Sequence, residues 1–302
     1  MPSSEQVRTG TAEQNSCRAS GVDVTAGAFS SGQASVEDIA ALARRLRRHV
    51  LTMTTRAGSG HPGGCLSAAD IVSVLYARIL RHDPSNPCWP ERDRFVLSKG
   101  HSAPVLYAVL AERGYFPVEE LLTLRAAGSR LQGHADMACT PGVEMSSGAL
   151  GQGLSFGLGM ALAARLDGAS HRVYVLLGDG ECDEGQVWEA AMAAAHYRVD
   201  SLTAVVDANG QQLDGDTRAI MNLEPFPEKW RAFGWHVQEV DGHDIPALIS
   251  AFEQARAVRG RPSVIIARTV KGRGVSFVER NLDFHGRALS QEQLERALAE
   301  LG

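Results

Sequence analysis

Two short polar segments follow apolar runs in the middle of the chain and contain residues suited to a divalent cation and a phosphate group. Gly178–Glu181 comes directly after one run, and Asp207–Gln211 directly follows the next. Ligands of open parallel sheets bind outside the carboxyl ends of the strands, so strands that end level bring Asn209 beside Asp179. One carboxylate, one amide oxygen and one backbone carbonyl suit Mg²⁺. The helix expected after Asp179 offers its N–H groups to phosphate.

The spacing of the two segments separates this pattern from an ordinary turn. An isolated Gly-Asp-Gly segment is a simple turn in most proteins. Here Asn209 follows the second apolar run at the distance expected for one intervening helix. The pair Asp179 and Asn209 therefore favours a binding site.

The elements that must position these residues are predicted from apolar periodicity. Ser35 and Asp38 resemble a capping box at the start of a helix that ends at the loop 58–64, and a second helix is expected over 67–80. Continuous apolar runs predict buried strands near 94–98, 173–177, 202–206 and 264–267, with helices such as 185–197 between them. The leucines at every fourth position from Leu150 to Leu162 predict a further helix. This alternation predicts an α/β fold, a parallel sheet with helices on both faces. We expect one domain over 35–302, preceded by a disordered segment over 1–34.

Several glycine- and histidine-rich segments accompany the metal-site pattern in a fixed order. They are Gly60-His61-Pro62-Gly63, Leu97–His101, Gln132-Gly133-His134, Gly148–Gly153, and Lys271–Ser276 leading to His285-Gly286. Together with Gly-Asp-Gly and Asn209, the set resembles the N-terminal, diphosphate-binding part of transketolase from about residue 37 to 287. Two positions depart from the commoner family pattern: Lys99 stands where many single-chain members have Asn, and the segment 146–149 replaces Thr-Thr-Gly-Pro.

The resemblance implies a role for each matching residue, with thiamine diphosphate and Mg²⁺ as cofactors. Asp179, Asn209 and the backbone carbonyl of Gln211 would hold Mg²⁺. The cofactor-binding residues would be His101, the backbone of Gly180 and Glu181, Asn209, His285, and Gly148, Ala149 and Leu150 at the aminopyrimidine end. His61, His134 and His285 would line the substrate channel as catalytic residues. Histidine both donates and accepts protons near neutral pH, which suits this chemistry.

The resemblance also implies a partner chain. A transketolase of ordinary length continues with a pyrimidine-binding domain, which carries the glutamate that activates the cofactor. We therefore expect the N-terminal subunit of a split transketolase, which pairs with a C-terminal subunit in an α₂β₂ assembly. It would transfer a two-carbon ketol unit between phosphorylated sugars. The alternative with the same cofactor is an acyloin- or ketol-forming synthase subunit. A non-catalytic homologue would be expected to lose Asp179, Asn209 or the channel histidines, and all are present.

Composition excludes several other classes. The net charge of −5 and the absence of long basic runs argue against a nucleic-acid partner. The apolar stretches fall short of the roughly 20 residues of a membrane-spanning helix. The N-terminus lacks a signal-peptide pattern, and the five cysteines form no C-x-x-C pair, which favours reduced thiols and a cytoplasmic location.

Overall fold

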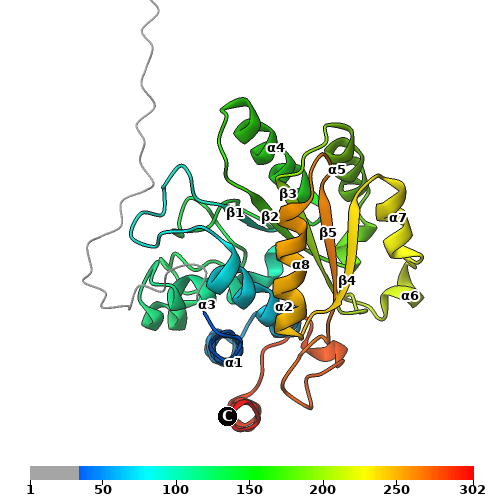
Figure 1. Ribbon diagram of the computed structural model, residues 1–302. Helices are drawn as coiled ribbons and strands as arrows, with labels where there is room; N and C mark the ends of the chain where they lie inside the picture. Colours follow the sequence, from blue (N-terminus) through cyan, green and yellow to red (C-terminus); the bar gives the residue numbers. More distant parts are fainter. Residues whose placement is uncertain (1–33) are drawn as a thin grey trace, which may run out of the picture.

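The computed structural model describes residues 34–302, and its centre is a five-stranded parallel sheet (Figure 1). The strands are β1 (Arg94–Leu97), β2 (Val173–Gly178), β3 (Leu202–Ala208), β4 (His236–Asp241) and β5 (Ser263–Arg268). Their order across the sheet is β1-β2-β3-β5-β4, and every neighbouring pair is parallel. The predicted parallel sheet is confirmed.

Helices cover both faces of this sheet, as predicted. Alternate residues of β2 point to opposite faces: Tyr174 and Leu176 join a core with α1, α2, α3, α8 and α9, whereas Val173, Val175 and Leu177 join a second core with α4, α5 and α7. The bounds are α1 (Val36–Ala57), α2 (Pro62–Val74), α3 (Ala103–Glu112), α4 (Gln152–Leu166), α5 (Gly185–His196), α6 (Thr217–Ile220), α7 (Phe226–Ala232), α8 (Ile245–Ala257) and α9 (Gln291–Leu301). In Figure 1, α9 lies beside α1 at the chain's C-terminal end.

The first helix begins and ends where the sequence predicts. Ser35 caps α1 and forms a capping box with Asp38, and Gly58 ends the helix in the left-handed conformation with φ 62°. The predicted disordered segment falls on residues outside the described part of the chain, apart from Ala34.

The second helix starts earlier than predicted. We expected a flexible loop through Gly64 and a helix over 67–80, but α2 begins at Pro62 and continues into one π-helical turn at Leu75–Ile79. Pro62 suits the first helical turn. Gly63 and Gly64 lie in the first turn of α2, where a side chain has little room. A Cβ on Gly63 would lie 3.0 Å from the Phe284 carbonyl oxygen, which explains the glycine there.

Two further expectations need correction. The strand β4 was not predicted, because its residues are half-buried or exposed at the sheet edge and form no continuous apolar run. The leucine helix begins at Gln152, so Leu150 precedes it and is exposed, whereas Leu154 and Leu158 are buried.

The cysteines agree in part with the prediction of reduced thiols. Within the described residues, Cys65, Cys139 and Cys182 are free thiols. No helix within residues 34–302 combines the length and apolar character required to cross a membrane.

Candidate active site

The ends of β2 and β3 bring Asp179 and Asn209 to one place, as the strand-end argument predicts. Gly178 pairs with Asp207 in the parallel register. Beyond this pair, the Asp179 carboxylate accepts hydrogen bonds from the Gly180 N–H (3.0 Å) and the Gly210 N–H (2.6 Å). One carboxylate thereby joins the turn after β2 to the segment after β3.

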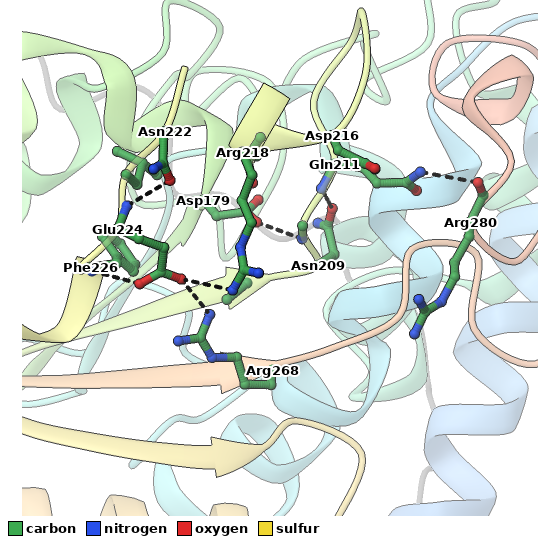
Figure 2. A pocket seen from close by; sticks show the side chains of 14 residues that line it. Asp179, Asn209, Gln211, Asp216, Arg218, Asn222, Glu224, Phe226, Arg268 and Arg280 are labelled. Carbon is green, nitrogen blue, oxygen red and sulfur yellow. Dashed lines mark hydrogen bonds and ion pairs between the residues drawn. The ribbon is translucent and has the colours of Figure 1, made fainter. Parts of the chain in front are cut away.

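A cavity of about 480 Å³ opens at this edge of the sheet. Figure 2 shows Asp179, Asn209 and Gln211 close together on its wall, with Glu224 between Arg218 and Arg268 elsewhere on the wall. All three residues assigned to Mg²⁺ from the sequence therefore line one cavity.

The chemistry of these three residues fits a hard cation. Asp179 is 6% exposed. Burial, and then the Asp207 carboxylate, raise its pKa to about 6. No lysine, arginine or histidine of the described residues forms an ion pair with it. The Asn209 Oδ1 accepts from the Gln211 N–H at 3.1 Å, and the Gln211 carbonyl oxygen accepts from the Lys271 ammonium at 3.3 Å.

An oxygen set with one carboxylate suits Mg²⁺ that takes its remaining ligands from phosphate and water. Within residues 34–302 no group of three or more His, Cys, Asp or Glu side chains is arranged to hold a metal ion. A cation at this edge would therefore depend on Asp179 and neutral oxygens.

The side chain of Glu181 forms hydrogen bonds with three neighbouring segments of the chain. Its carboxylate is buried and accepts from the Gly151 N–H and the Gly178 N–H, both at 2.9 Å, and from the Ser98 hydroxyl. The side chain of Glu181 is therefore engaged within the protein, and its backbone is the part that the resemblance assigns to the diphosphate. A Cβ on neighbouring Gly180 would lie 2.8 Å from the Gln212 Cβ, so the close approach requires glycine there.

Three of the four predicted site histidines form one cluster. His61 precedes α2, His101 lies in the turn Gly100–Ser102, and His285 follows the turn Leu282–Phe284. The ring centroids are 5.3 Å apart for His61 and His101, and 5.6 Å apart for each of the other two pairs. None of these histidines lines the 480 Å³ cavity.

His134 lies to one side of the cluster, next to the predicted aminopyrimidine segment. It is exposed, and its ring lies 3.7 Å from the place that a Cβ on Gly148 would take. Gly148, Ala149 and Leu150 are also exposed. The structure thus places His134 beside Gly148 rather than inside the cluster.

Lys271 connects the histidine cluster with the cation side of the site. Its ammonium donates to the His285 Nδ1 at 2.7 Å and to the Gln211 carbonyl oxygen. Because Nδ1 accepts this bond, a neutral His285 carries its proton on Nε2. Burial, and then the Lys99 charge, lower the pKa of Lys271 to about 8.

Burial also keeps the clustered histidines neutral at pH 7. It is the largest influence on His285, followed by the charge of Lys271, and together they lower the pKa of His285 to about 4. Burial and then Lys99 lower the pKa of His101 to about 2. The pKa of His61 is lowered for the same leading reason. The cluster therefore offers neutral imidazoles.

A buried ion pair beneath the site was missed from the sequence. The Lys99 ammonium pairs with the Asp207 carboxylate, and the exposed fractions of the two side chains are 2% and 0%. Lys99 also donates to the Gly64 carbonyl oxygen (3.0 Å), and Asp207 accepts from the Ser67 hydroxyl (2.6 Å) and from Thr269. One sequence signal was available: the chain has only three lysines, and both Lys99 and Lys271 lie in glycine-rich segments.

Buried side-chain polar atoms without a hydrogen-bond partner occur in several parts of the described residues, and three of them lie in this region. They are the His61 Nδ1, the Ser147 Oγ and the Gln211 Oε1. Such atoms are rare in folded proteins, and each carries a desolvation penalty. A bound polar ligand would satisfy them.

Comparison with known proteins accounts for this arrangement. Residues 38–302 match the family model described as transketolase, thiamine diphosphate binding domain. The 6-deoxy-6-sulfo-D-fructose transketolase subunit of a Clostridium species is 49% identical over 87% of this chain and 96% of its own length. The chain belongs to the transketolase family. It is a component of a transketolase-type transferase with thiamine diphosphate as its cofactor, and the match extends past the residue 287 expected from the sequence.

Other members of the family differ in length. An apulose-4-phosphate transketolase subunit from Actinobacillus succinogenes is 41% identical over 88% of this chain and 97% of its own length. Human transketolase is 44% identical over 86% of this chain, which spans only 41% of the human protein. The crystal structure of transketolase from Campylobacter jejuni superposes with a TM-score of 0.84 at 34% identity, and the match covers 89% of this chain and 43% of that one. The chain thus spans nearly all of the subunit relatives but about two fifths of the longer transketolases.

The position of the histidine cluster leads to a first prediction. His61→Ala and His285→Ala should still bind thiamine diphosphate, because neither residue is one of the three candidate Mg²⁺ ligands. Each should lower kcat by about 100-fold or more, the usual contribution of a positioned proton donor or acceptor. Cofactor titration and steady-state turnover, both with the partner chain present, measure the two effects. His196→Ala, an exposed histidine at the end of α5, is the matched control. Near-native turnover of either variant would remove that histidine from the catalytic set.

Proposed function

We propose that this chain is the N-terminal subunit of a two-chain transketolase, which transfers a two-carbon ketol unit between phosphorylated sugars. The proposal rests on the contacts of Lys271, whose ammonium group bonds both the Gln211 carbonyl oxygen, a candidate Mg²⁺ ligand, and His285 of the cluster of neutral histidines. The names of the relatives of equal length, transketolase subunits for a sulfosugar and for a sugar phosphate, support this proposal.

When bound, thiamine diphosphate supplies the nucleophilic carbon that attacks the donor carbonyl group. In our proposal, Asp179, Asn209 and the Gln211 carbonyl hold Mg²⁺, and the turn Gly180–Glu181 contacts the diphosphate. His61 and His285 exchange protons with the hydroxyl groups of the sugar. Since the His285 Nδ1 accepts from Lys271, its Nε2–H is the group that donates to the substrate.

The partner in this proposal is a C-terminal subunit that brings the pyrimidine-binding domain and the activating glutamate. The exposed face near the aminopyrimidine segment supports a protein partner: Leu150, Phe156 of α4 and Met192 of α5 are 36%, 50% and 57% exposed. Large exposed apolar side chains of this kind mark interaction surfaces. We infer an α₂β₂ assembly and a cytoplasmic location, which mass photometry and cell fractionation would test.

The proposal predicts that the chain alone shows no turnover with ketose phosphates, even with excess Mg²⁺ and thiamine diphosphate. Turnover should appear when the partner subunit is added, because the activating acid would come from that chain. The measurement is consumption of the ketose donor before and after the addition. Full turnover by the single chain would contradict the two-chain proposal. Activity with an α-keto acid donor instead would favour an acyloin-forming synthase.

A further inference from the structure

The loop that carries His61 and the loop that carries His134 meet at one arginine. The Arg125 Nη1 donates a hydrogen bond to the Ser59 hydroxyl at 2.8 Å. Its guanidinium also lies against Gly133: a Cβ there would fall 2.8 Å from the Cζ, Nε and Nη2 atoms. A single side chain therefore contacts the residue two positions before His61 and the residue just before His134.

The backbone holds Arg125 in an unusual conformation. Its φ of 60° lies in the left-handed region, which a residue with a Cβ adopts only at a cost in free energy. The Arg125 N–H donates to the Leu131 carbonyl oxygen at 2.9 Å, which closes the turn that directs the side chain toward Ser59 and Gly133. Strained residues of this kind persist where the surrounding structure requires them, and they gather at functional sites.

The side chain of Arg125 is exposed and has no carboxylate partner among the described residues. Within residues 34–302 no carboxylate forms an ion pair with its guanidinium, in contrast to nearby Arg130, which pairs with Glu120 at 3.0 Å. The rings of His101 and His285 lie against His61, and the charges of Arg125, His134 and Lys271 act on it. The charge that acts on His134 is that of Arg125.

We propose that Arg125 is a positioning residue of the candidate substrate channel, whose guanidinium fastens the His61 loop to the His134 loop and keeps a positive charge beside both imidazoles. Only the expected effect on turnover rests on the proposed function. The contacts of Arg125 with Ser59 and Gly133, and its charge beside the histidines, are properties of this chain alone. After burial, the Arg125 charge is the next influence that lowers the pKa of His61 and of His134. Removal of the charge therefore raises both pKa values.

Two variants separate the charge from the position of the guanidinium. Arg125→Gln removes the charge. Gly133→Ala keeps the charge but displaces the guanidinium, since the new Cβ would collide with the flexible end of the arginine and the Gly133 backbone is not in the left-handed region. Arg125→Lys keeps a positive charge but lacks the planar guanidinium group with its several N–H donors. Arg130→Gln is the matched control on the same segment.

The first measurement is NMR titration of the histidine side chains in the full chain, which needs neither partner nor activity. Arg125→Gln should raise the pKa of His61 and of His134, Gly133→Ala should raise them less, and Arg125→Lys should leave them near the native values. The second measurement is turnover with the partner subunit. Arg125→Gln and Gly133→Ala should lower kcat/KM by about 10- to 100-fold, the loss expected from a displacement of about 1 Å. Cofactor affinity should be unchanged, and the acidic limb of the pH profile of Arg125→Gln should move to higher pH.

Unchanged titration of both histidines in Arg125→Gln overturns the proposal, and so does a loss of kcat/KM that Arg130→Gln shares. If Arg125→Gln fails to fold, the histidine titrations and turnover of Arg125→Lys and Gly133→Ala are compared with those of the native chain instead. If the native assembly shows no transketolase turnover, the proposed function fails, while the titrations still decide the role of Arg125.

Discussion

Asp179→Ala is expected to lower the Mg²⁺-dependent affinity for thiamine diphosphate by at least about 100-fold, since even outer-shell partners of metal ligands contribute about 10- to 100-fold. Asp179 lies beside Asn209 and Gln211 on the wall of the cavity at the ends of β2 and β3. The atoms of Asn209 and Gln211 that would bind the metal are neutral oxygens. Without the Asp179 carboxylate, the protein would offer the cation only neutral oxygens. The cation would then be held more weakly, and the diphosphate would lose the charge that it would supply.

The measurement is cofactor titration at fixed Mg²⁺ concentration with the partner subunit present. Asp183→Ala is the matched control, because it removes an exposed carboxylate from the same turn. Thermal unfolding of both variants shows whether the fold persists. Asp179→Ala loses two hydrogen bonds from backbone N–H groups but also relieves repulsion from Asp207. Native affinity in Asp179→Ala would remove this residue from the metal site.

Lys99→Met is expected to lower the free energy of unfolding by about 3–5 kcal/mol, the usual result of removing one partner from a buried ion pair. Asp207 is fully buried, and burial by itself opposes its ionisation. The charge of Lys99 and the hydrogen bonds from Lys99, Ser67 and Thr269 nevertheless hold the pKa of Asp207 below its usual value. Methionine fills the volume of the lysine but leaves the carboxylate without its cation.

Chemical denaturation of the single chain measures this effect, and Lys229→Met on α7 is the matched control because Lys229 forms no ion pair within residues 34–302. The same substitution should raise the pKa of His101 and of Lys271, since the Lys99 charge lowers both. Equal stability of Lys99→Met and Lys229→Met would show that the pair adds nothing to the fold.

Much of the sheet and of the cation site follows from local sequence. Four of the five strands are continuous apolar runs, because strands covered on both faces need apolar residues at every position. The approach of Asn209 to Asp179 follows from adjacent parallel strands that end level, so two short segments and their spacing were sufficient. The capping box at Ser35 is equally local, because both of its hydrogen bonds join residues three apart.

The sequence by itself determined the family, the parallel sheet and the residues gathered at the carboxyl ends of its strands. Tertiary structure alone decided how those residues are connected. Lys99 meets Asp207, and Lys271 meets both His285 and Gln211, across separations in the chain that no periodicity encodes. Gly63 and Gly64 lie in a helix although glycine disfavours helices, and Phe284, Lys271 and Lys99 occupy the space that larger side chains would need there. Arg125 joins two histidine loops for a similar reason: its contacts with Ser59 and Gly133 exist only after the chain has folded, when burial and close packing set which groups touch and which charges are felt.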